Sequence, residues 1–229
     1  PGGEDIPNHQ DTSQQRAHTL VDDTEAVVDH ILGLCSRSGR IDFLLDNVGL
    51  ELVSDLYLAA FLLKQNLVGT VHLHAKVHPT FVSDAMIKDV QQTVAFLSAD
   101  DDLVVAGIGQ LLQRLMDSDR LKLQVHWFWT SPLEMWQMPA SLKNELDRSD
   151  LLVSKGDANY RRLLGDRHWS FTTPFDDIVR YLPAPIVALR TFKSEVAAGL
   201  KPGQAEEVTE WDPEWLYSGQ WGMIQYSGR

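Results

Sequence analysis

The sequence predicts an α/β protein, a three-layer α/β/α sandwich with a mostly parallel central sheet. Two observations lead to this fold class. Short apolar runs of strand length, rich in β-branched or aromatic residues, alternate with longer stretches in which apolar residues recur at helical spacing. Such alternation is typical of parallel sheets covered by helices on both faces. The length of 229 residues suits one large domain.

The elements can be placed in order along the chain. Residues 1–17 are mostly polar and are expected to form a flexible tail or former interdomain linker, and residues 18–229 the folded domain. A first helix is expected from His18 to Cys35. Strands are predicted at 41–45, 71–75, 121–129, 151–154, 186–189 and 223–226, and helices at 49–65, 85–97, 103–116, 133–147, 159–164 and 192–200. The segment 202–221 is expected to be irregular and to lead into a last strand at the sheet edge.

The amino-acid composition limits the classes of molecule that the protein is expected to bind and the compartment in which it is expected to occur. Lysine and arginine total 20 against 32 aspartate and glutamate residues, a net charge of −12, which disfavours nucleic acid and anionic membranes as partners. No apolar run reaches the ~18–20 residues of a membrane span. The single cysteine, Cys35, excludes an internal disulfide and favours a reducing compartment, the cytoplasm or the nucleus. Since the chain starts with Pro1 and lacks a secretory signal, we expect a fragment or one domain of something longer.

Chemistry is expected at the carboxyl ends of the strands, where open α/β sheets bind ligands. The first strand is followed by Asp46 and Asn47, and a helix then begins near Glu51. A carboxylate beside a carboxamide offers hard oxygen ligands for Mg²⁺ or Mn²⁺. The alternative is structural, with Asp46 or Asn47 as a helix N-cap and Glu51 complementing the helix dipole. Asp55, one turn after Glu51, is expected to be solvated.

A second strand ends near Lys76, and Asp84 follows where the next helix is expected to begin. Taken alone, Asp84 fits a helix N-cap with Lys88 as its partner four residues on. Its place after a second strand, however, lets Asp84 converge with Asp46 at the same edge of the sheet.

Cations follow a third strand. Lys155 and Asp157 come directly after it, and a helix is expected to open with Arg161 and Arg162 in its first turn. Positive charge there faces the positive end of the helix dipole, and a bound anion would remove this conflict. Simple solvation of the two arginines is the alternative.

A fourth strand is followed by Arg190, Thr191 and Lys193, with Thr191 as a candidate N-cap of a further helix. Phosphate is the anion that best suits a lysine beside backbone donors. Two strand ends thus supply oxygen ligands and two supply cations. Together they predict metal-assisted phosphoryl chemistry.

Other signals favour structural roles. His72 and His74 share one face of a predicted strand, but no third ligand completes a zinc spacing, so we expect neutral core or surface histidines. Gly107-Ile108-Gly109 lacks the third glycine of a dinucleotide fingerprint.

Four motifs at these strand ends resemble, in order and spacing, those of the metal-dependent damage-control phosphatases. Within that family the sequence is similar to the sugar-phosphate phosphatase branch, also named acidic-residue methyltransferase. The motifs are Asp-Asn-x-Gly-x-Glu at 46–51, Phe-Val-Ser-Asp at 81–84, Lys-Gly-Asp-x-Asn-Tyr-Arg at 155–161 and Arg-Thr-x-Lys at 190–193.

The resemblance implies a metal-dependent phosphatase of metabolite damage control, acting on small sugar phosphates such as fructose 1-phosphate and fructose 6-phosphate. The implied cofactor is Mn²⁺, Ni²⁺, Co²⁺ or Mg²⁺, held by Asp46, Asn47 and Asp84. Glu51 matches a position linked to the methyltransferase proposal. Members of this branch also carry a helical N-terminal domain, which implies a longer parent chain. The residues matched to substrate binding are Asp46, Asn47, Asp157, Asn159, Tyr160, Arg161, Arg190 and Lys193.

For catalysis we expect Asp46, Asp84 and Asp157 to act together. Asp157 or Asp46 orients the attacking water or serves as acid–base, and Lys193 neutralises charge on the phosphoryl oxygens, with Arg190 a weaker candidate for that role. Both a metal-bound water and a carboxylate remain candidates for the nucleophile.

Two other functions are considered. One is an S-adenosylmethionine-dependent protein-glutamate O-methyltransferase, although a glycine-rich cofactor loop is missing. The other is a non-catalytic sugar-phosphate-binding module.

Overall fold

The computed structural model describes residues 17–228, so residues 1–16 of the predicted tail lie outside the described part. A seven-stranded sheet crosses the molecule in the order β1-β7-β6-β5-β2-β3-β4. The fold is therefore α/β, as predicted. Its strands are β1 (Thr19–Asp22), β2 (Arg40–Leu44), β3 (Thr70–Ala75), β4 (Leu121–Val125), β5 (Leu151–Lys155), β6 (Ile186–Thr191) and β7 (Gly222–Ser227).

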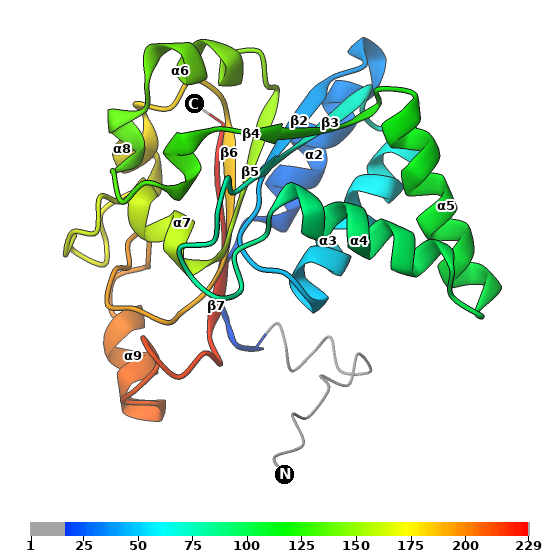
Figure 1. Ribbon diagram of the computed structural model, residues 1–229. Coiled ribbons are helices and arrows are strands. Elements are labelled where there is room, and N and C mark those ends of the chain that lie inside the picture. The colour runs from blue at the N-terminus through cyan, green and yellow to red at the C-terminus, as the bar shows by residue number, and fades with distance from the viewer. Residues whose placement is uncertain (1–16, 229) are drawn as a thin grey trace.

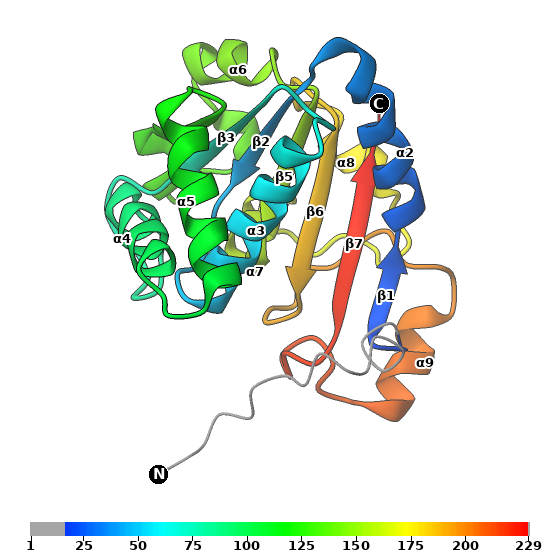
Figure 2. The same ribbon diagram turned by 90° about the vertical axis from the view of Figure 1, so that its right-hand side faces the viewer.

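Five neighbouring strands, β6, β5, β2, β3 and β4, are mutually parallel. β7 runs antiparallel to β6 and parallel to β1, so these two strands run against the other five. β7 is thus not an edge strand as predicted, because β1 pairs along its outer side (Figure 2).

Helices cover both faces of the sheet, which gives the three predicted layers (Figures 1 and 2). The side chains of β2 alternate between two cores: Ile41 and Phe43 face one, and Leu44 faces the other. The first core is covered by α2 (Thr24–Leu34), α3 (Leu50–Lys64), α4 (Ile87–Ser98) and α5 (Leu103–Asp117). The second is covered by α6 (Ala140–Leu146), α7 (Gly156–Leu163), α8 (Phe175–Val179) and α9 (Gln204–Trp211).

The N-terminal segment differs from the predicted helix over 18–35. Thr19–Asp22 is strand β1, and the helix begins only at Thr24. Leu20 and Val21 fit a helical pattern, but both pack against the core while the backbone pairs with β7, about two hundred residues away in sequence. Tertiary pairing here overrides a local pattern.

Two predicted elements in the middle of the chain are shorter than expected. The strand over 121–129 ends at Val125, and Trp127–Thr130 forms the 3₁₀ helix η2, capped by the His126 ring, which accepts from Phe128 N at 3.0 Å. The helix over 133–147 is a 3₁₀ turn, η3 (Met135–Gln137), followed by α6, whose N-cap is Pro139.

No helix forms over 192–200. Phe192, Val196 and Leu200 are buried in the core, which explains their apolar spacing. The carbonyl groups of Ser194 and Val196, which a helix would use internally, instead accept hydrogen bonds from the Arg190 guanidinium. Thr191 is therefore not an N-cap. The segment over 202–221, expected to be irregular, contains α9.

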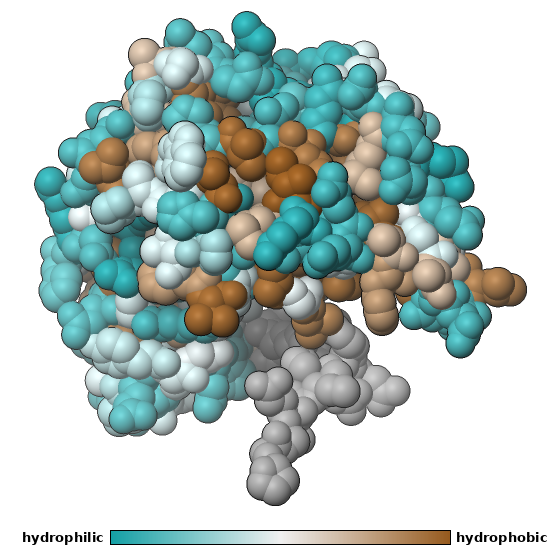
Figure 3. Space-filling view, viewed as in Figure 1, coloured by the Kyte–Doolittle hydropathy of each residue, from teal (hydrophilic) through white to brown (hydrophobic). Residues whose placement is uncertain are grey.

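The surface is mixed. Figure 3 shows hydrophilic residues over most of the face in view and separate groups of hydrophobic ones, one of them at the end of the α4–α5 hairpin, where Leu103 and Val104 are exposed. Over residues 17–228, no helix combines the length and the apolar character that crossing a membrane requires.

Candidate active site

The candidate site lies where the order of the strands reverses. β2 has β3 on one side and β5 on the other. After β2 the chain adds β3 and β4 on one side of it, and it later adds β5 and β6 on the opposite side. The loops after β2 and β5 diverge at this point, which is where ligands bind in open α/β sheets. A pocket of about 610 Å³ opens there. It is lined by eight predicted site residues: Asp46, Asn47, Glu51, Asp84, Asp157, Arg161, Arg190 and Lys193.

Two loops place Asp46 and Asp84 in one wall of the pocket. The loop after β2 bonds to the loop before α4 through Val48 N to Ser83 O at 2.7 Å and Ala85 N to Asp46 O at 2.9 Å. A backbone bridge also joins Asn47 and Asp84. The convergence of these two strand ends is what the sequence predicted.

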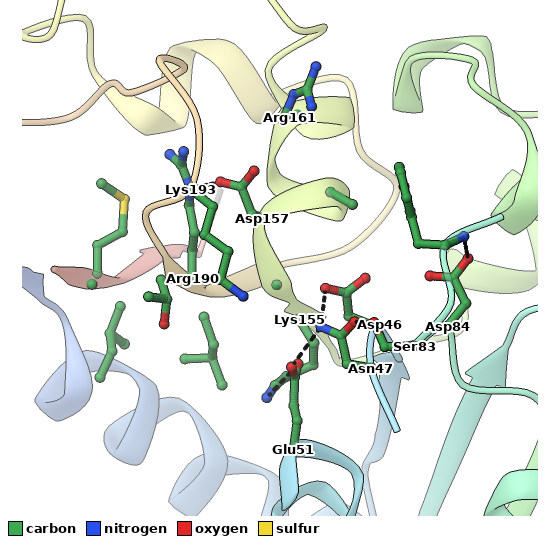
Figure 4. A pocket seen from close by; sticks show the side chains of 18 of the residues that line it. Asp46, Asn47, Glu51, Ser83, Asp84, Lys155, Asp157, Arg161, Arg190 and Lys193 are labelled. Atoms are coloured by element: carbon green, nitrogen blue, oxygen red, sulfur yellow. Dashed lines mark hydrogen bonds and ion pairs between the residues drawn. The ribbon is translucent and has the colours of Figure 1, made fainter. Parts of the chain in front are cut away.

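Asp84 is not a helix N-cap, because α4 begins at Ile87 with Met86 as its N-cap. Asp84 is buried, and its Oδ2 accepts hydrogen bonds from Thr80 N at 2.8 Å and Phe81 N at 3.1 Å. These bonds fix the carboxylate within its own loop. Its other oxygen accepts no hydrogen bond from residues 17–228, and Figure 4 shows the carboxylate on the pocket wall beside Asp46.

Asp46 is a buried carboxylate in a negatively charged neighbourhood. Burial, together with the nearby charges of Glu51 and Asp84, raises the pKa of Asp46 to about 6 against the lowering effect of Lys76 and Lys155. A carboxylate cluster of this kind is stabilised by a bound cation.

Asn47 connects the acidic groups. Its Nδ2 donates to Asp46 Oδ2 at 2.9 Å and to Glu51 Oε2 at 3.0 Å, and its Oδ1 accepts from Ser83 Oγ at 2.6 Å (Figure 4). The carboxamide is thus held between the helix that carries Glu51 and the loop that carries Asp84.

The donor set fits a hard divalent cation. Asp46 and Asp84 each have an oxygen that accepts no hydrogen bond from the described residues, and Asn47 offers a neutral amide oxygen, which also accepts from Ser83 Oγ. Among residues 17–228, no three His, Cys, Asp or Glu side chains form a metal-binding group. The set therefore supplies two carboxylates and an amide, which suits an ion such as Mg²⁺ that keeps several water ligands.

Asp157 lies across the pocket and is held by Arg190. Arg190 Nε donates to Asp157 Oδ1 at 2.7 Å, and Ser194 Oγ donates to the same oxygen at 3.1 Å. The guanidinium is buried between the rings of Tyr160 and Phe192, with its carbon 4.3 Å from each centroid. Its remaining bonds go to Ser194 and Val196. Arg190 therefore positions Asp157, and as a phosphate contact it stays the weaker candidate beside Lys193.

Lys193 brings a free positive charge into the pocket. Its side chain is exposed, it forms no ion pair with any described residue, and Figure 4 shows its amine directed into the pocket. Of the predicted cations, Lys193 is best placed to meet an anionic ligand.

Arg161 and Arg162 lie differently from the prediction. α7 begins at Gly156, so both arginines occupy its last turn, where positive charge suits the helix dipole. The predicted conflict is therefore absent. Arg161 pairs with Asp166 at 2.7 Å and still lines the pocket. Arg162 donates to the carbonyl oxygens of Phe128, Trp129 and Leu133.

Asn159 and Tyr160, matched to substrate binding, do not line the pocket. Asn159 is buried and donates to the carbonyl oxygens of Leu44, Leu45 and Lys155, which ties α7 to the ends of β2 and β5. Tyr160 is fully buried and donates to Gln225 Oε1 at 2.7 Å. Both residues support the site from behind.

The sequence patterns did not predict the buried ion pair between Asp55 and Lys155. Asp55 is not solvated: its side chain is 4% exposed and pairs with Lys155 at 2.9 Å, and Lys155 also approaches Glu51 at 3.5 Å. Burial raises the pKa of Asp55 to about 6. The available signal was the spacing of Asp55 on α3, between the buried Leu52 and Leu56.

The sequence patterns also gave no role to Gly156, which lies against Asp46 in the site. It has φ +78°, and a Cβ atom there would stand 1.8 Å from Asp46 Oδ2. Only glycine lets α7 begin this close to Asp46.

The histidines of β3 lie in the core, as one of the two expected placements had it. His72 and His74 are buried; His74 Nε2 lies 2.7 Å from Asp42 Oδ1, and Asp42 also pairs with Arg40 at 2.7 Å. They belong to a buried polar cluster away from the pocket.

Curated proteins with related sequences share a name. Damage-control phosphatase ARMT1 from Xenopus tropicalis is 41% identical over 192 residues, covering 82% of this chain and 44% of the relative. The Rattus norvegicus protein of the same name is 39% identical, with the same coverage. That of Xenopus laevis is 38% identical over 222 residues, 93% of this chain and 50% of the relative. The chain thus spans about half the length of these relatives.

Among solved structures, a DUF89 family protein from Pyrococcus horikoshii matches with a TM-score of 0.43 and 16% identity, covering 83% of this chain and 49% of that one. The sequence pattern of the damage-control phosphatase ARMT1-like domain matches residues 3–208. Since that match takes in far more than half of the 229 residues, the chain belongs to the damage-control phosphatase ARMT1-like domain family.

Proposed function

We propose that this chain is a metal-dependent phosphomonoesterase that hydrolyses small sugar phosphates, with fructose 1-phosphate and fructose 6-phosphate as the first candidates. The observation that carries the proposal is the meeting of Asp46, Asn47 and Asp84 with Lys193 and Asp157 around one pocket. Oxygen donors for a cation and a free lysine for an anion then face the same space. Family membership supports a phosphatase.

Asp46, Asn47 and Asp84 would hold the divalent ion, Mn²⁺, Ni²⁺, Co²⁺ or Mg²⁺. When bound, such an ion polarises a phosphoryl oxygen and stabilises the charge that grows there. The protein's own side chains would bind the substrate, orient the attacking water and transfer protons.

Lys193 would neutralise the non-bridging oxygens of the phosphoryl group, since its amine is free and reaches into the pocket. Asp157, with one oxygen fixed by Arg190 and Ser194, would orient the attacking water with its other oxygen. Asp46 is the other candidate for acid–base catalysis, because its carboxylate lies in the same pocket.

The direct test is phosphate release from fructose 1-phosphate with Mn²⁺ and, in parallel, with EDTA. The variant Asp84→Asn keeps an oxygen that can accept from Thr80 N and Phe81 N but removes the charge. We expect turnover with Mn²⁺, none with EDTA, and at least a hundredfold loss in Asp84→Asn. Asp101→Ala, at an exposed position, is the control. Undiminished turnover in Asp84→Asn removes the metal-site assignment.

A further inference from the structure

The candidate pocket continues into a second chamber. This chamber has a volume of about 490 Å³ and shares Phe81, Asp84, Ala158 and Arg161 with the pocket. Its far wall comes from η2 and the residues after it, including Trp129 and Pro132. A ligand in the pocket can therefore extend past Asp84 without leaving the cleft.

The notable residue in this chamber is Lys76. It follows β3, its side chain lines the second chamber and not the first, and it is only 6% exposed. Among residues 17–228, no carboxylate comes within 4.0 Å of its ammonium group and the ammonium has no hydrogen-bond partner; the charges of Asp46 and Asp84 act on it from a greater distance. Lys76 is thus a buried cation that opens into a cavity and, among the described residues, has carboxylates near it but none in direct ion-pair contact.

The other buried cations are satisfied by the protein. Lys155 pairs with Asp55, Arg190 with Asp157, and Arg40 with Asp42. An unpaired buried charge costs free energy unless a ligand or water compensates it. The contrast indicates that the Lys76 ammonium, unlike these three cations, is open to direct contact with an anionic group from outside the chain.

The charges around the chamber favour an anion. Of the carboxylates on its wall, Asp166 is neutralised by Arg161, and Asp84 belongs to the candidate metal site. On this wall the two cations Lys76 and Arg162 then outnumber the remaining carboxylate, Glu134. Burial lowers the pKa of Arg162 to about 10, so it stays charged at neutral pH.

We propose that the second chamber is a subsite for a second anionic group of the substrate, with Lys76 as its anchor. The preferred substrates are then phosphomonoesters that carry a further phosphate or carboxylate, with the reacting phosphoryl group beside Lys193 and the second group beside Lys76. The inference rests on the proposed function, because it places the reacting group in the first pocket.

Binding without turnover tests this inference. In EDTA, calorimetry compares two matched pairs of probes with the full chain: 6-phosphogluconate with glucose 6-phosphate, and fructose 1,6-bisphosphate with fructose 6-phosphate. We expect the doubly anionic member of at least one pair to bind about tenfold or more tightly. A gain in the first pair identifies a carboxylate as the second group, and a gain in the second pair a phosphate. Equal affinity within both pairs, including no binding by any probe, overturns the inference.

Variants identify the anchor. Lys76→Met should reduce the preference to less than twofold, and Lys76→Arg should retain part of it. Lys88→Met, an exposed lysine on α4, should leave it unchanged. If Lys76→Met instead weakens all four probes equally, Lys76 serves the first pocket and the inference is wrong.

A stability measurement adds an independent check. With Mn²⁺ present to neutralise Asp46 and Asp84, and with no anionic ligand, Lys76→Met removes a buried charge that has no ion-pair partner, so its melting temperature should equal or exceed that of the native chain. A marked decrease would show that the ammonium has a structural partner within the protein and would overturn the inference. The phosphate-release assay decides the proposed function separately, so either idea can fail while the other stands.

Discussion

Gly156 controls how closely α7 approaches the acidic wall of the site. Its backbone has φ +78°, and the space where a Cβ would lie is taken by the Asp46 carboxylate. We predict that Gly156→Ala lowers stability by about 1–3 kcal/mol, because it adds backbone strain and displaces Asp46, and that it weakens Mn²⁺ binding. Urea unfolding and calorimetric titration with Mn²⁺ measure the two effects.

Gly107→Ala is the matched control. Gly107 lies within α5, and nothing stands within 4 Å of where its Cβ would be. Alanine there should stabilise the protein by about 0.5–1 kcal/mol. Gly156→Ala with native Mn²⁺ affinity would contradict the role given to this glycine.

His72 makes stability depend on pH. Burial lowers the pKa of His72 from 6.5 to about 4. Between these values the unfolded chain binds a proton that the folded chain does not, so this residue reduces stability as the pH falls from 6.5 toward 4. His72→Gln should remove up to about 3 kcal/mol of that loss.

Urea unfolding at pH 7 and pH 4.5 checks this prediction, with the exposed His78→Gln as control. An unchanged difference in unfolding free energy between the two pH values in His72→Gln would show that His72 does not resist protonation.

The position of a site residue was predictable where the side chain comes within two or three residues of a strand end. Asp46, Asn47 and Asp157 do so, and topology alone brings them to one pocket. The sequence did not show that Asn159 and Tyr160 lie behind the pocket, because a motif gives order along the chain but not which face of a helix lines a pocket; their role in substrate binding stays a prediction. The prediction for Asp55 failed, since burial of a charge depends on the distant Lys155.

At the scale of elements, the Asp55–Lys155 pair ties α3 to the end of β5. We predict that Lys155→Met destabilises the protein by about 3 kcal/mol, because Asp55 then stays buried without its main partner. The double variant Asp55→Asn, Lys155→Met should recover much of this loss. A double-mutant cycle by urea unfolding measures the coupling. Strict additivity of the two single changes would show that the two groups do not depend on each other.

Elements with local causes were predictable. α3 and α5 follow from their apolar periodicity, and Asp102 accepts from Val104 N and Val105 N at the start of α5, as an N-cap should. The segment over 192–200 was not predictable, since its helical-looking apolar spacing comes from packing against a core made by other elements. The Arg190 side chain takes up the backbone carbonyls that a helix would need.

For the whole molecule, a metal ion at the proposed site should stabilise the fold. Asp46 and Asp84 belong to different loops, so an ion held by both links them in the folded state only. At a concentration one hundred times its dissociation constant, Mn²⁺ should add about 2.7 kcal/mol to the free energy of unfolding. Thermal unfolding with and without Mn²⁺ measures this, and Asp84→Asn should abolish the increase. An equal increase in that variant would place the ion elsewhere.

The pairing of β1 with β7 affects the order in which the chain folds during synthesis. β1 comes early in the described sequence, yet its hydrogen-bonding partner is β7, near the end. During synthesis β1 stays without its partner strand β7 until nearly all the other described elements have emerged. Closing so long a loop is slow relative to local contacts. The outer edge of the sheet is therefore the last part to form on the ribosome, and nascent chains interrupted before β7 expose an open strand edge to their neighbours.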